Sequence, residues 1–290
     1  MSPRFPMEET FFSIIVPTYN CAAKIEATIL SVIDQREAPY ELIVMDGLSQ
    51  DDTLSIVRKY AEQSPDKIRW VSQKDAGVYD AMNKGIDLSR GKYLYFLGAG
   101  DQLRPGVLPQ IAGAAPKQGP ALLYGGTFWV DSQTEYKGLC SKEQLAVSSL
   151  CHQSIFYERS VFALVGRYEL KYRTNADWAL NIKCFGDSRI EKIFVDTIVA
   201  DYEGGGMSAT TFDPEFTRDR SRLAAQYLGV KTAGYRYFVT EQTLAIRTAK
   251  APTPIARKFW LGQLWLLHNI VRPLFYGRLY RQARQAGKSG

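Results

Sequence analysis

Polar or acidic residues follow four short apolar runs in the first hundred residues of this 290-residue chain. In YLYFLGAGDQL, for example, apolar residues 93–97 give way to glycines and then to Asp101. The four polar segments are PTYN (17–20), DGLSQDDT (46–53), QKDAGVYD (73–80) and GAGD (98–101). Carboxylates in such segments can bind a base or ribose, or hold a divalent cation against a diphosphate. The first apolar run is followed by no G-x-G-x-x-G, and the chain has no G-x-x-x-x-G-K-[ST] loop, which disfavours dinucleotide enzymes and simple nucleotide hydrolases.

The elements that must position these residues alternate between strand and helix. Apolar runs at 11–16, 41–45, 67–72 and 92–98 predict strands, and the segments between them, including 51–63 and 77–89, have helical periodicity. This alternation predicts an α/β fold with a mostly parallel sheet and helices on both faces. Ligands of such sheets bind outside the carboxyl ends of the strands, so we expect the four segments to meet at one cleft. Further strand-like runs at 121–130 and 192–202 precede a helical C-terminal part.

Composition predicts a globular protein of a reducing compartment. The chain is 46% hydrophobic and 23% charged, its four cysteines are far apart, and no secretory signal opens the sequence, so we expect a cytoplasmic location. Nine of the 36 basic residues, and no acidic residue, follow Glu241; the remaining 27 basic and 30 acidic residues give a net charge of −3. This asymmetry favours an anionic membrane surface, and not nucleic acid, as the partner of the tail.

The tail segment 256–284 has apolar stretches that are interrupted by polar residues and a proline. It is too broken for a membrane span, which needs ~20 mostly apolar residues. On a helical wheel its basic and polar residues gather opposite its apolar residues, which predicts a helix lying on the inner face of the cell membrane. A helix packed on the protein's own core, or on a partner subunit, is the alternative, and the sequence leaves the oligomeric state open. The polar side comprises Arg257, Lys258, His268, Asn269 and Arg272.

Four segments of the chain resemble, in order, the N-terminal motifs of the inverting glycosyltransferases of family 2, which have the GT-A fold: SIIVPTYN, ELIVMDGLSQDDT, KDAGVYDAMNKGI and GKYLYFLGAGD. CHQSIFY, NADWAL and GGGMS extend the resemblance to the subgroup that assembles bacterial surface polysaccharides. The resemblance implies a Rossmann-like GT-A domain over residues 1–210. Its nucleotide-sugar half would cover about 11–104 and its acceptor half about 105–210, with a helical, basic, amphipathic membrane-association region at 211–290.

The resemblance also implies an enzyme that moves a sugar from a nucleotide-sugar donor, a UDP-sugar, to a glycan or polyprenyl-diphosphate-linked acceptor. Asp46 would accept a hydrogen bond from the imide N–H of uracil. His152 and Gln153 would contact the diphosphate or the acceptor, although a lone histidine is more often structural. The residues implied to frame the base and ribose are Pro17, Thr18, Tyr19 and Asn20, and those beside the sugar and diphosphate are Asp75, Gly77, Asp80, Asn83 and Lys84.

Two carboxylates carry the implied chemistry. Asp101 matches the last acid of the family's D-x-D element and would hold Mg²⁺ or Mn²⁺, although Ala99 replaces the first acid and Gly98 stands where Asp or Asn is common. Asp177 of NADWAL would be the general base, since inversion requires a base across the sugar from the leaving diphosphate; a helix cap is the alternative. The missing acid leaves a second function open, a catalytically degenerate GT-A module that binds nucleotide sugar or acts as a scaffold.

Overall fold

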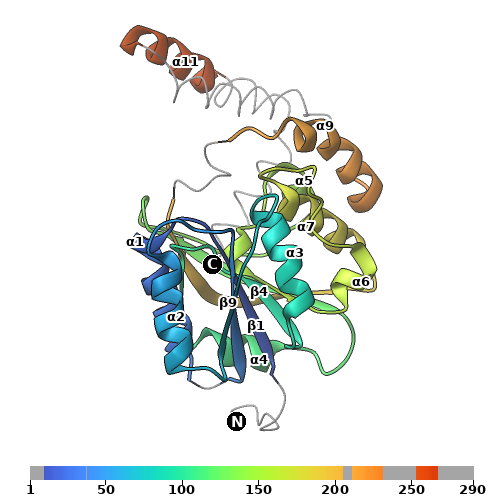
Figure 1. Cartoon of the computed structure of the whole chain (residues 1–290). Coiled ribbons are helices and arrows are strands. Elements are labelled where there is room, and N and C mark those ends of the chain that lie inside the picture. The colour runs from blue at the N-terminus through green and yellow to red at the C-terminus, as the bar shows by residue number, and fades with distance from the viewer. Residues whose placement is uncertain (1–9, 37, 205–210, 231–252, 267–290) are drawn as a thin grey trace.

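The computed structural model describes residues 10–36, 38–204, 211–230 and 253–266. Nine strands within these residues form one sheet in the order β3-β2-β1-β4-β8-β6-β9-β5, with β7 paired to β6. Figure 1 shows the sheet at the centre of the molecule. The strands are β1 (Phe12–Thr18), β2 (Tyr40–Asp46), β3 (Ile68–Ser72), β4 (Tyr93–Phe96), β5 (Gln102–Leu103), β6 (Ala121–Trp129), β7 (Thr134–Tyr136), β8 (Ile155–Glu158) and β9 (Glu191–Tyr202).

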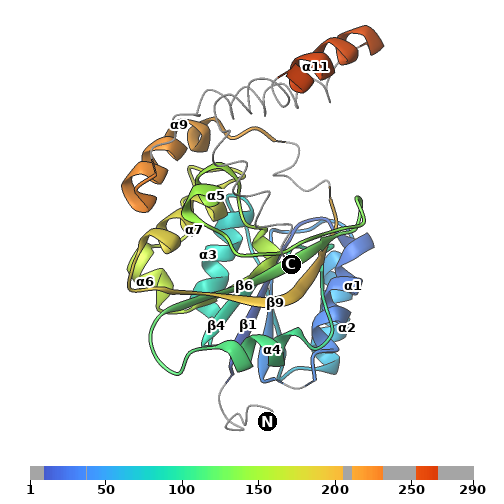
Figure 2. The same ribbon diagram turned by 180° about the vertical axis from the view of Figure 1, so that it is seen from behind.

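Helices cover both faces of the sheet, as Figures 1 and 2 show from opposite sides. The side chains of β1 alternate between these two faces and are apolar on both. Ile14 and Val16 join the core under α1, α2 and α4, and Ile15 joins the core under α3, α5, α6 and α7. A strand that is buried on both faces reads as a continuous apolar run. The helices are α1 (Ala22–Ile33), α2 (Thr53–Gln63), α3 (Val78–Leu88), α4 (Val107–Ala114), α5 (Lys142–Val147), α6 (Val161–Val165) and α7 (Ala176–Gly186), with a 3₁₀ turn η1 (His152–Ser154).

The predicted strands and helices of the first hundred residues are confirmed, and β1 pairs in parallel with both β2 and β4. The prediction of a mostly parallel sheet holds only for this half. Beyond β4 the described sheet is mixed, because β8 runs antiparallel between β4 and β6, while β6 and β9 are parallel to each other. The carboxyl ends of β1, β2 and β4 therefore share one edge, as the cleft prediction requires.

The helical extension begins with α9 (Pro214–Leu223) and the π-helical turn η2 (Ala224–Leu228), which pack against α7. Asp213 caps α9 through a 3.0 Å hydrogen bond from Phe216 N, and the ring of Phe216 lies 5.0 Å from that of Trp178. Helix α11 (Pro254–Leu266) is separate from these layers in both views. Within the described residues, no helix combines the length and apolar character that a membrane crossing requires. Most of GGGMS, and the tail from residue 267 onward, lie outside the described residues.

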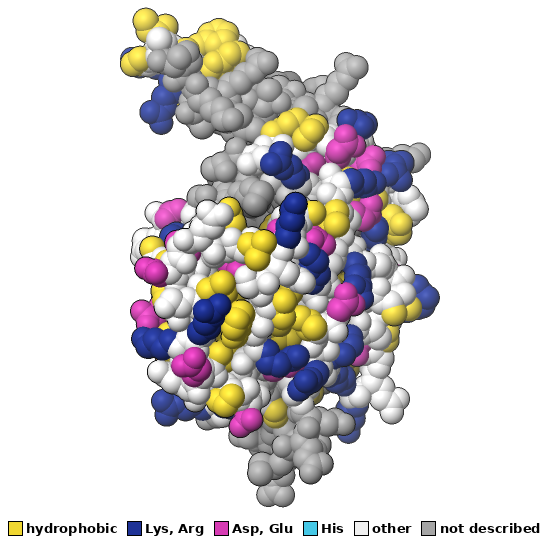
Figure 3. Space-filling view, viewed as in Figure 1, with side chains coloured by type: hydrophobic (Ala, Val, Ile, Leu, Met, Phe, Trp, Pro, Cys, Tyr) yellow, Lys and Arg dark blue, Asp and Glu magenta, His cyan; other side chains and the backbone are white. Residues whose placement is uncertain are grey.

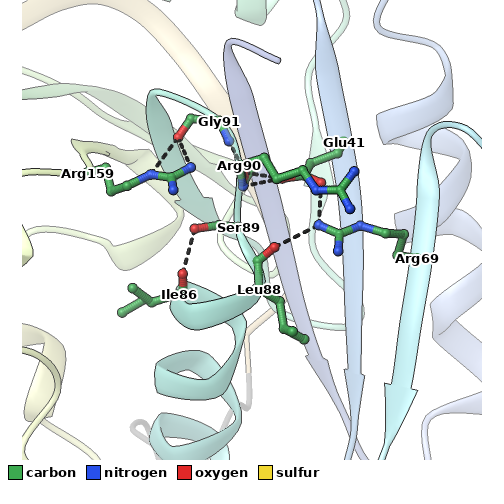
Figure 4. A network of polar contacts seen from close by, with 9 residues as sticks. Glu41, Arg69, Ile86, Leu88, Ser89, Arg90, Gly91 and Arg159 are labelled. Carbon is green, nitrogen blue, oxygen red and sulfur yellow. Dashed lines mark hydrogen bonds and ion pairs between the residues drawn. The ribbon is translucent and has the colours of Figure 1, made fainter. Parts of the chain in front are cut away.

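A buried carboxylate, Glu41, joins the amino-terminal ends of the central strands, at the end of the sheet opposite the cleft (Figure 4). Its oxygens accept hydrogen bonds of 2.6 Å from Ser13 Oγ and of 2.6 Å from the Arg90 amide, and it forms an ion pair with Arg69. Arg69 also donates to the carbonyl of Leu88 at 2.7 Å. Glu41 therefore fixes the turn between α3 and β4 against β1 and β3.

We expect Glu41→Gln to lower the free energy of unfolding by about 2–4 kcal/mol at neutral pH, because it removes one partner of a buried ion pair. Burial raises the pKa of Glu41, but the Ser13, Arg90 and Arg69 contacts outweigh burial, so the net pKa is lowered. The carboxylate thus contributes its full stability above the ordinary pKa of 4.5, and this contribution is lost as pH falls through the depressed value. Urea titrations at several pH values measure both effects.

The matched control is Glu26→Gln. Glu26 likewise has a basic and a hydroxyl partner, a lysine and a tyrosine, but its side chain is about half exposed. It should change the free energy of unfolding far less than Glu41→Gln. Equal effects of the two substitutions would contradict the structural role of Glu41.

Candidate active site

A cleft of about 950 Å³ opens where the carboxyl ends of β1 and β4 meet η1, the first turn of α7 and the end of β9. The parallel pairing of the strands brings these loops together, although the residues are far apart in the sequence. Nine of the predicted site residues line this cleft: Pro17, Thr18, Tyr19, Asp75, Gly77, Asp101, His152, Gln153 and Asp177.

Asp101 is the most enclosed acid of the cleft, with 5% of its surface exposed. One carboxylate oxygen accepts a 2.9 Å hydrogen bond from the amide of Glu203, and the other accepts a 2.7 Å bond from Gln153 Nε2. Burial raises the pKa of Asp101 to about 7, and the Glu203 charge adds to this shift, while the two hydrogen bonds and Lys24 oppose it. Asp101 therefore changes charge near neutral pH.

The surroundings of Asp101 fit a cation that is held by one carboxylate together with phosphate oxygens. A carboxylate has about four acceptor positions, and the two hydrogen bonds leave capacity for a cation. Mg²⁺ is commonly bound through one or two carboxylates and substrate phosphates. The described residues contain no group of three or more His, Cys, Asp or Glu side chains that is arranged for a metal.

The same carboxylate leaves no space for a side chain at Gly98. A Cβ atom at this position would lie 2.5 Å from Asp101 Oδ2 and 3.3 Å from Gln153 Nε2. The close approach explains the glycine at this position, because the carboxylate of Asp101 lies against the backbone of residue 98.

Asp177 is the second residue of α7 and is half-buried in the wall of the cleft. Its Oδ1 accepts a 2.7 Å hydrogen bond from the hydroxyl of Tyr79 on α3. Burial, followed by the Asp177 charge, raises the pKa of Tyr79 well above its ordinary value, so Tyr79 remains a donor at neutral pH. The residue before α7 is Asn175, so Asp177 does not occupy the capping position itself.

The start of α7 is also held from outside the sheet domain. Asp213, the cap of α9, accepts a 2.9 Å hydrogen bond from the amide of Thr174, three residues before Asp177. The C-terminal helix α9 thus helps to position the predicted base.

His152 lies at the back of the cleft, with its ring 5.6 Å from Phe96 and 5.8 Å from Tyr168. Burial lowers the pKa of His152, although the Asp177 charge opposes the shift, so the imidazole is neutral at physiological pH. Both ring nitrogens are buried, and neither has a hydrogen-bond partner among the residues that the structure describes. Buried polar atoms usually have partners, so this histidine can accept or donate a hydrogen bond to a bound molecule.

Two other predicted residues, Asp46 and Asn20, hold the loops beside the cleft and do not line it. Asp46 is buried, and its carboxylate accepts hydrogen bonds from the amides of Leu48 and Ser49 and from Ser72 Oγ. Asn20 accepts a 2.8 Å bond from the amide of Gln50 through its side chain. These contacts fix the loop after β2 against the loop after β1.

The predicted residues on α3 outside the lining are Asp80, Asn83 and Lys84. Asp80 forms a 2.9 Å ion pair with Lys84, which also donates to the carbonyl of Lys74 at 2.8 Å. Asn83 hydrogen bonds through its side chain to both the carbonyl and the amide of Tyr168. These three side chains therefore bind protein groups around α3.

The site residues that were not predicted include Tyr79, Lys24 and Glu203. Lys24 forms a 2.6 Å ion pair with Glu203, and both line the cleft. Tyr79 lies within the motif KDAGVYDAMN, between the predicted acids Asp75 and Asp80, and this position was the available signal. Lys24 and Glu203 are 179 positions apart, and no pattern in the sequence relates them.

Comparison with known proteins identifies the family and the fold of this chain. The model of the family "Glycosyl transferase family 2" matches residues 13–174. A PGL/p-HBAD biosynthesis glycosyltransferase of Mycobacterium bovis is 38% identical over 216 residues, which are 73% of this chain and 84% of the relative. The poly(ribitol-phosphate) beta-N-acetylglucosaminyltransferase TarP of Staphylococcus aureus is 26% identical over 173 residues, 56% of this chain and 52% of TarP.

Solved structures show the same fold at low sequence identity. Staphylococcus aureus TarS superposes with a TM-score of 0.63 at 16% identity, over 89% of this chain and 81% of that structure. The mannosyltransferase PcManGT of Pyrobaculum calidifontis superposes with a TM-score of 0.54 at 17% identity, over 98% of this chain and 77% of that structure. These likenesses confirm the predicted GT-A architecture. With the family match and the mycobacterial relative, they establish that this chain belongs to glycosyl transferase family 2 and is a glycosyltransferase.

Proposed function

We propose that this chain is an inverting enzyme that transfers a sugar from a UDP-sugar to a glycan or lipid-linked glycan acceptor during surface-polysaccharide synthesis. The observation that carries the proposal is that Asp101 and Asp177, from opposite halves of the domain, line one cleft. Two carboxylates in different surroundings suit two different roles, since burial raises the pKa of Asp101 and Tyr79 donates to Asp177.

The proposed mechanism assigns the proton transfer to Asp177. Inversion requires the acceptor hydroxyl to attack the anomeric carbon on the face opposite the leaving diphosphate. Asp177 would take the proton of that hydroxyl, and the Tyr79 hydrogen bond on Oδ1 would orient the carboxylate and leave Oδ2 for the acceptor. A divalent cation, Mg²⁺ or Mn²⁺, when bound at Asp101, would neutralise charge on the diphosphate. His152 and Gln153 would hold donor groups between the two acids.

The nucleotide would bind at the ends of β1 and β2. Tyr19 exposes 62% of its surface beside Pro17 and Thr18, which suits stacking on a base. The carboxylate of Asp46 is occupied by loop amides, so it would support the base pocket through these loops, and a direct uracil contact would replace one of these partners. We assign Asp75 and Gly77 to the ribose and diphosphate side, with Asn20, Asp80, Asn83 and Lys84 fixing the surrounding loops and helix.

The relatives and neighbours support the substrate classes in this proposal. TarS is described in complex with UDP-GlcNAc, PcManGT with GDP-Man and Mn²⁺, and GalNAc-T7 with UDP, GalNAc and Mn²⁺. TarP acts, by its name, on poly(ribitol-phosphate). A nucleotide-sugar donor, a divalent cation and a surface glycan are the corresponding assignments for this chain.

The membrane assignment rests on α11. Its basic residues Arg257 and Lys258 are exposed, as are Ile255, Phe259 and Leu261. Figure 3 shows hydrophobic and basic side chains together on this helix. We propose that α11 lies among anionic headgroups on the inner face of the membrane, near a lipid-linked acceptor.

We expect Asp101→Asn to lower the transfer rate by about 100-fold or more, because it removes the carboxylate that would hold the cation. In the wild type, the Mn²⁺-dependent rate should rise with pH through about 7, since only ionised Asp101 binds a cation well. Rates measured from pH 6 to about 8 over a Mn²⁺ titration test both statements. Full activity in EDTA would overturn the cation assignment.

Stability provides the control for this variant. The pKa of Asp101 is raised in the folded state. Its favourable contribution to the free energy of unfolding is therefore complete below the ordinary pKa of 3.8 and is lost as pH rises through about 7. Above neutral pH, Asp101→Asn should therefore unfold at the same temperature as the wild type or a higher one. A lower midpoint would attribute the lost activity to misfolding.

Asp177→Asn should leave UDP affinity nearly unchanged and lower the transfer rate by ~10²–10⁴-fold, as expected for loss of a general base. Tyr79→Phe should have a smaller effect in the same direction, because it removes only the hydrogen bond on Oδ1. Isothermal titration with UDP and single-turnover transfer separate binding from chemistry. Loss of thermal stability in step with activity would instead favour a structural role of Asp177 at the start of α7. Nucleotide binding by a wild type that never transfers a sugar would favour the scaffold function.

The double variant Arg257→Glu/Lys258→Glu should weaken binding to vesicles rich in anionic lipid by at least about tenfold, since each basic residue near the surface contributes about 1 kcal/mol. The matched control is Arg58→Glu/Lys59→Glu, an adjacent exposed pair on α2. Sedimentation with liposomes measures the difference. No sedimentation of the wild type, or equal loss in both variants, would refute the assignment.

A further inference from the structure

Three aromatic side chains gather on one wall of the cleft: Trp129 at the end of β6, Tyr136 on β7 and Tyr202 at the end of β9. The ring of Trp129 lies 5.1 Å from that of Tyr136 and 5.0 Å from that of Tyr202, at interplanar angles of 56° and 59°. Trp129 is 36% exposed and Tyr136 is 54% exposed. These rings therefore present apolar surface to the cleft. We call the three residues the aromatic wall.

Strand register places the three side chains on the same face. Trp129 pairs directly with Tyr202, and Tyr136 pairs with Thr127, two residues before Trp129. Directly paired residues share a face, and residues two apart on a strand share a face, so the rings must be neighbours.

Two glycines in ALLYGGTFWV, Gly125 and Gly126, make this arrangement possible. The β6–β9 register shifts on either side of Gly126, and such irregularities redirect a strand. A Cβ at Gly126 would lie 2.4 Å from Lys137 Cβ and 2.9 Å from the carbonyl of Tyr136, so β7 could not approach. The missing side chain at Gly126 thus lets β7 pack closely on β6 and brings Tyr136 beside Trp129.

The position of the aromatic wall in the sheet separates it from the nucleotide loops. Strands β6 and β9 lie on one side of β4, and β1 and β2 lie on the other. Asp101 follows β4 and so lies between the two sides, with Asp177 in the same cleft. A donor that extends from Tyr19 to Asp101 leaves the aromatic wall to the second substrate.

We propose that the aromatic wall binds a pyranose ring of the acceptor, adjacent to the hydroxyl that receives the sugar. This inference rests on the proposed function and identifies the class of its second substrate. Angled rings offer apolar faces to the C–H face of a pyranose, and the Tyr136 hydroxyl and Ser148 of the cleft lining offer hydrogen bonds to its hydroxyl groups.

The test uses the full chain with UDP present and two probe sets, the methyl and the p-nitrophenyl glycosides of glucose, galactose, rhamnose and N-acetylglucosamine. Saturation-transfer difference NMR should detect the ring C–H protons of at least one methyl glycoside on the wild type. Trp129→Ala should weaken this binding by about 2- to 12-fold, and Tyr136→Ala by a similar or smaller factor, while UDP affinity is unchanged. Trp129→Phe should retain most of the binding.

Trp70→Ala is the matched control, because Trp70 is a partly exposed tryptophan on β3 near the opposite end of the sheet. It should not change glycoside binding. The inference is overturned if no methyl glycoside binds the wild type, if only the p-nitrophenyl forms bind, or if Trp129→Ala binds like the wild type. Failure of the wild type to bind UDP would overturn the proposed function instead, so the two failures are distinguishable.

Discussion

The buried carboxylate of Asp101 is the point on which the architecture of the cleft depends. Its oxygens accept hydrogen bonds from Gln153 of η1 and from Glu203 at the end of β9, and its carbonyl accepts one from Thr28 of α1. One residue thus joins three segments that are remote in sequence. Burial raises the pKa of Asp101 to about 7, while the hydrogen bonds from Glu203 and Gln153 oppose this shift. The cleft is therefore organised around an acid whose surroundings pull its charge in opposite directions, and perturbed acids of this kind are common at functional sites.

Local periodicity was sufficient to predict the first half of the fold. Each of β1 to β4 is a short apolar run, and each helix between them buries a face of 3.6-residue period, so sequence neighbours are also structural neighbours. The second half depends on contacts between distant segments. The antiparallel placement of β8 and the pairing of β6 with β9, about 70 residues apart, follow from packing and not from any local pattern.

The candidate site shows the same division. Acids at strand ends could be predicted to converge, and Asp75 and Asp101 do line one cleft, together with Asp177 from the start of α7. Sequence reasoning could not tell which motif residues face the cleft and which fix its loops, because Asp46 and Asn83 differ from them only in the partners that folding supplies. Trp129 was visible as an aromatic residue in a strand, but its place beside Tyr136 and Tyr202 depends on pairing between strands that are distant in the sequence.

Gly98 limits which side chains this site accepts beside Asp101. A side chain at position 98 would collide with Asp101 Oδ2, so an added carboxylate there would displace the one already present. Asp101 could move only by giving up its bonds to Gln153 and Glu203. Substitutions among these contacting residues are expected to be non-additive, each tolerated only in the presence of another. A carboxylate can therefore be added at position 98 only together with a change among these contacting residues.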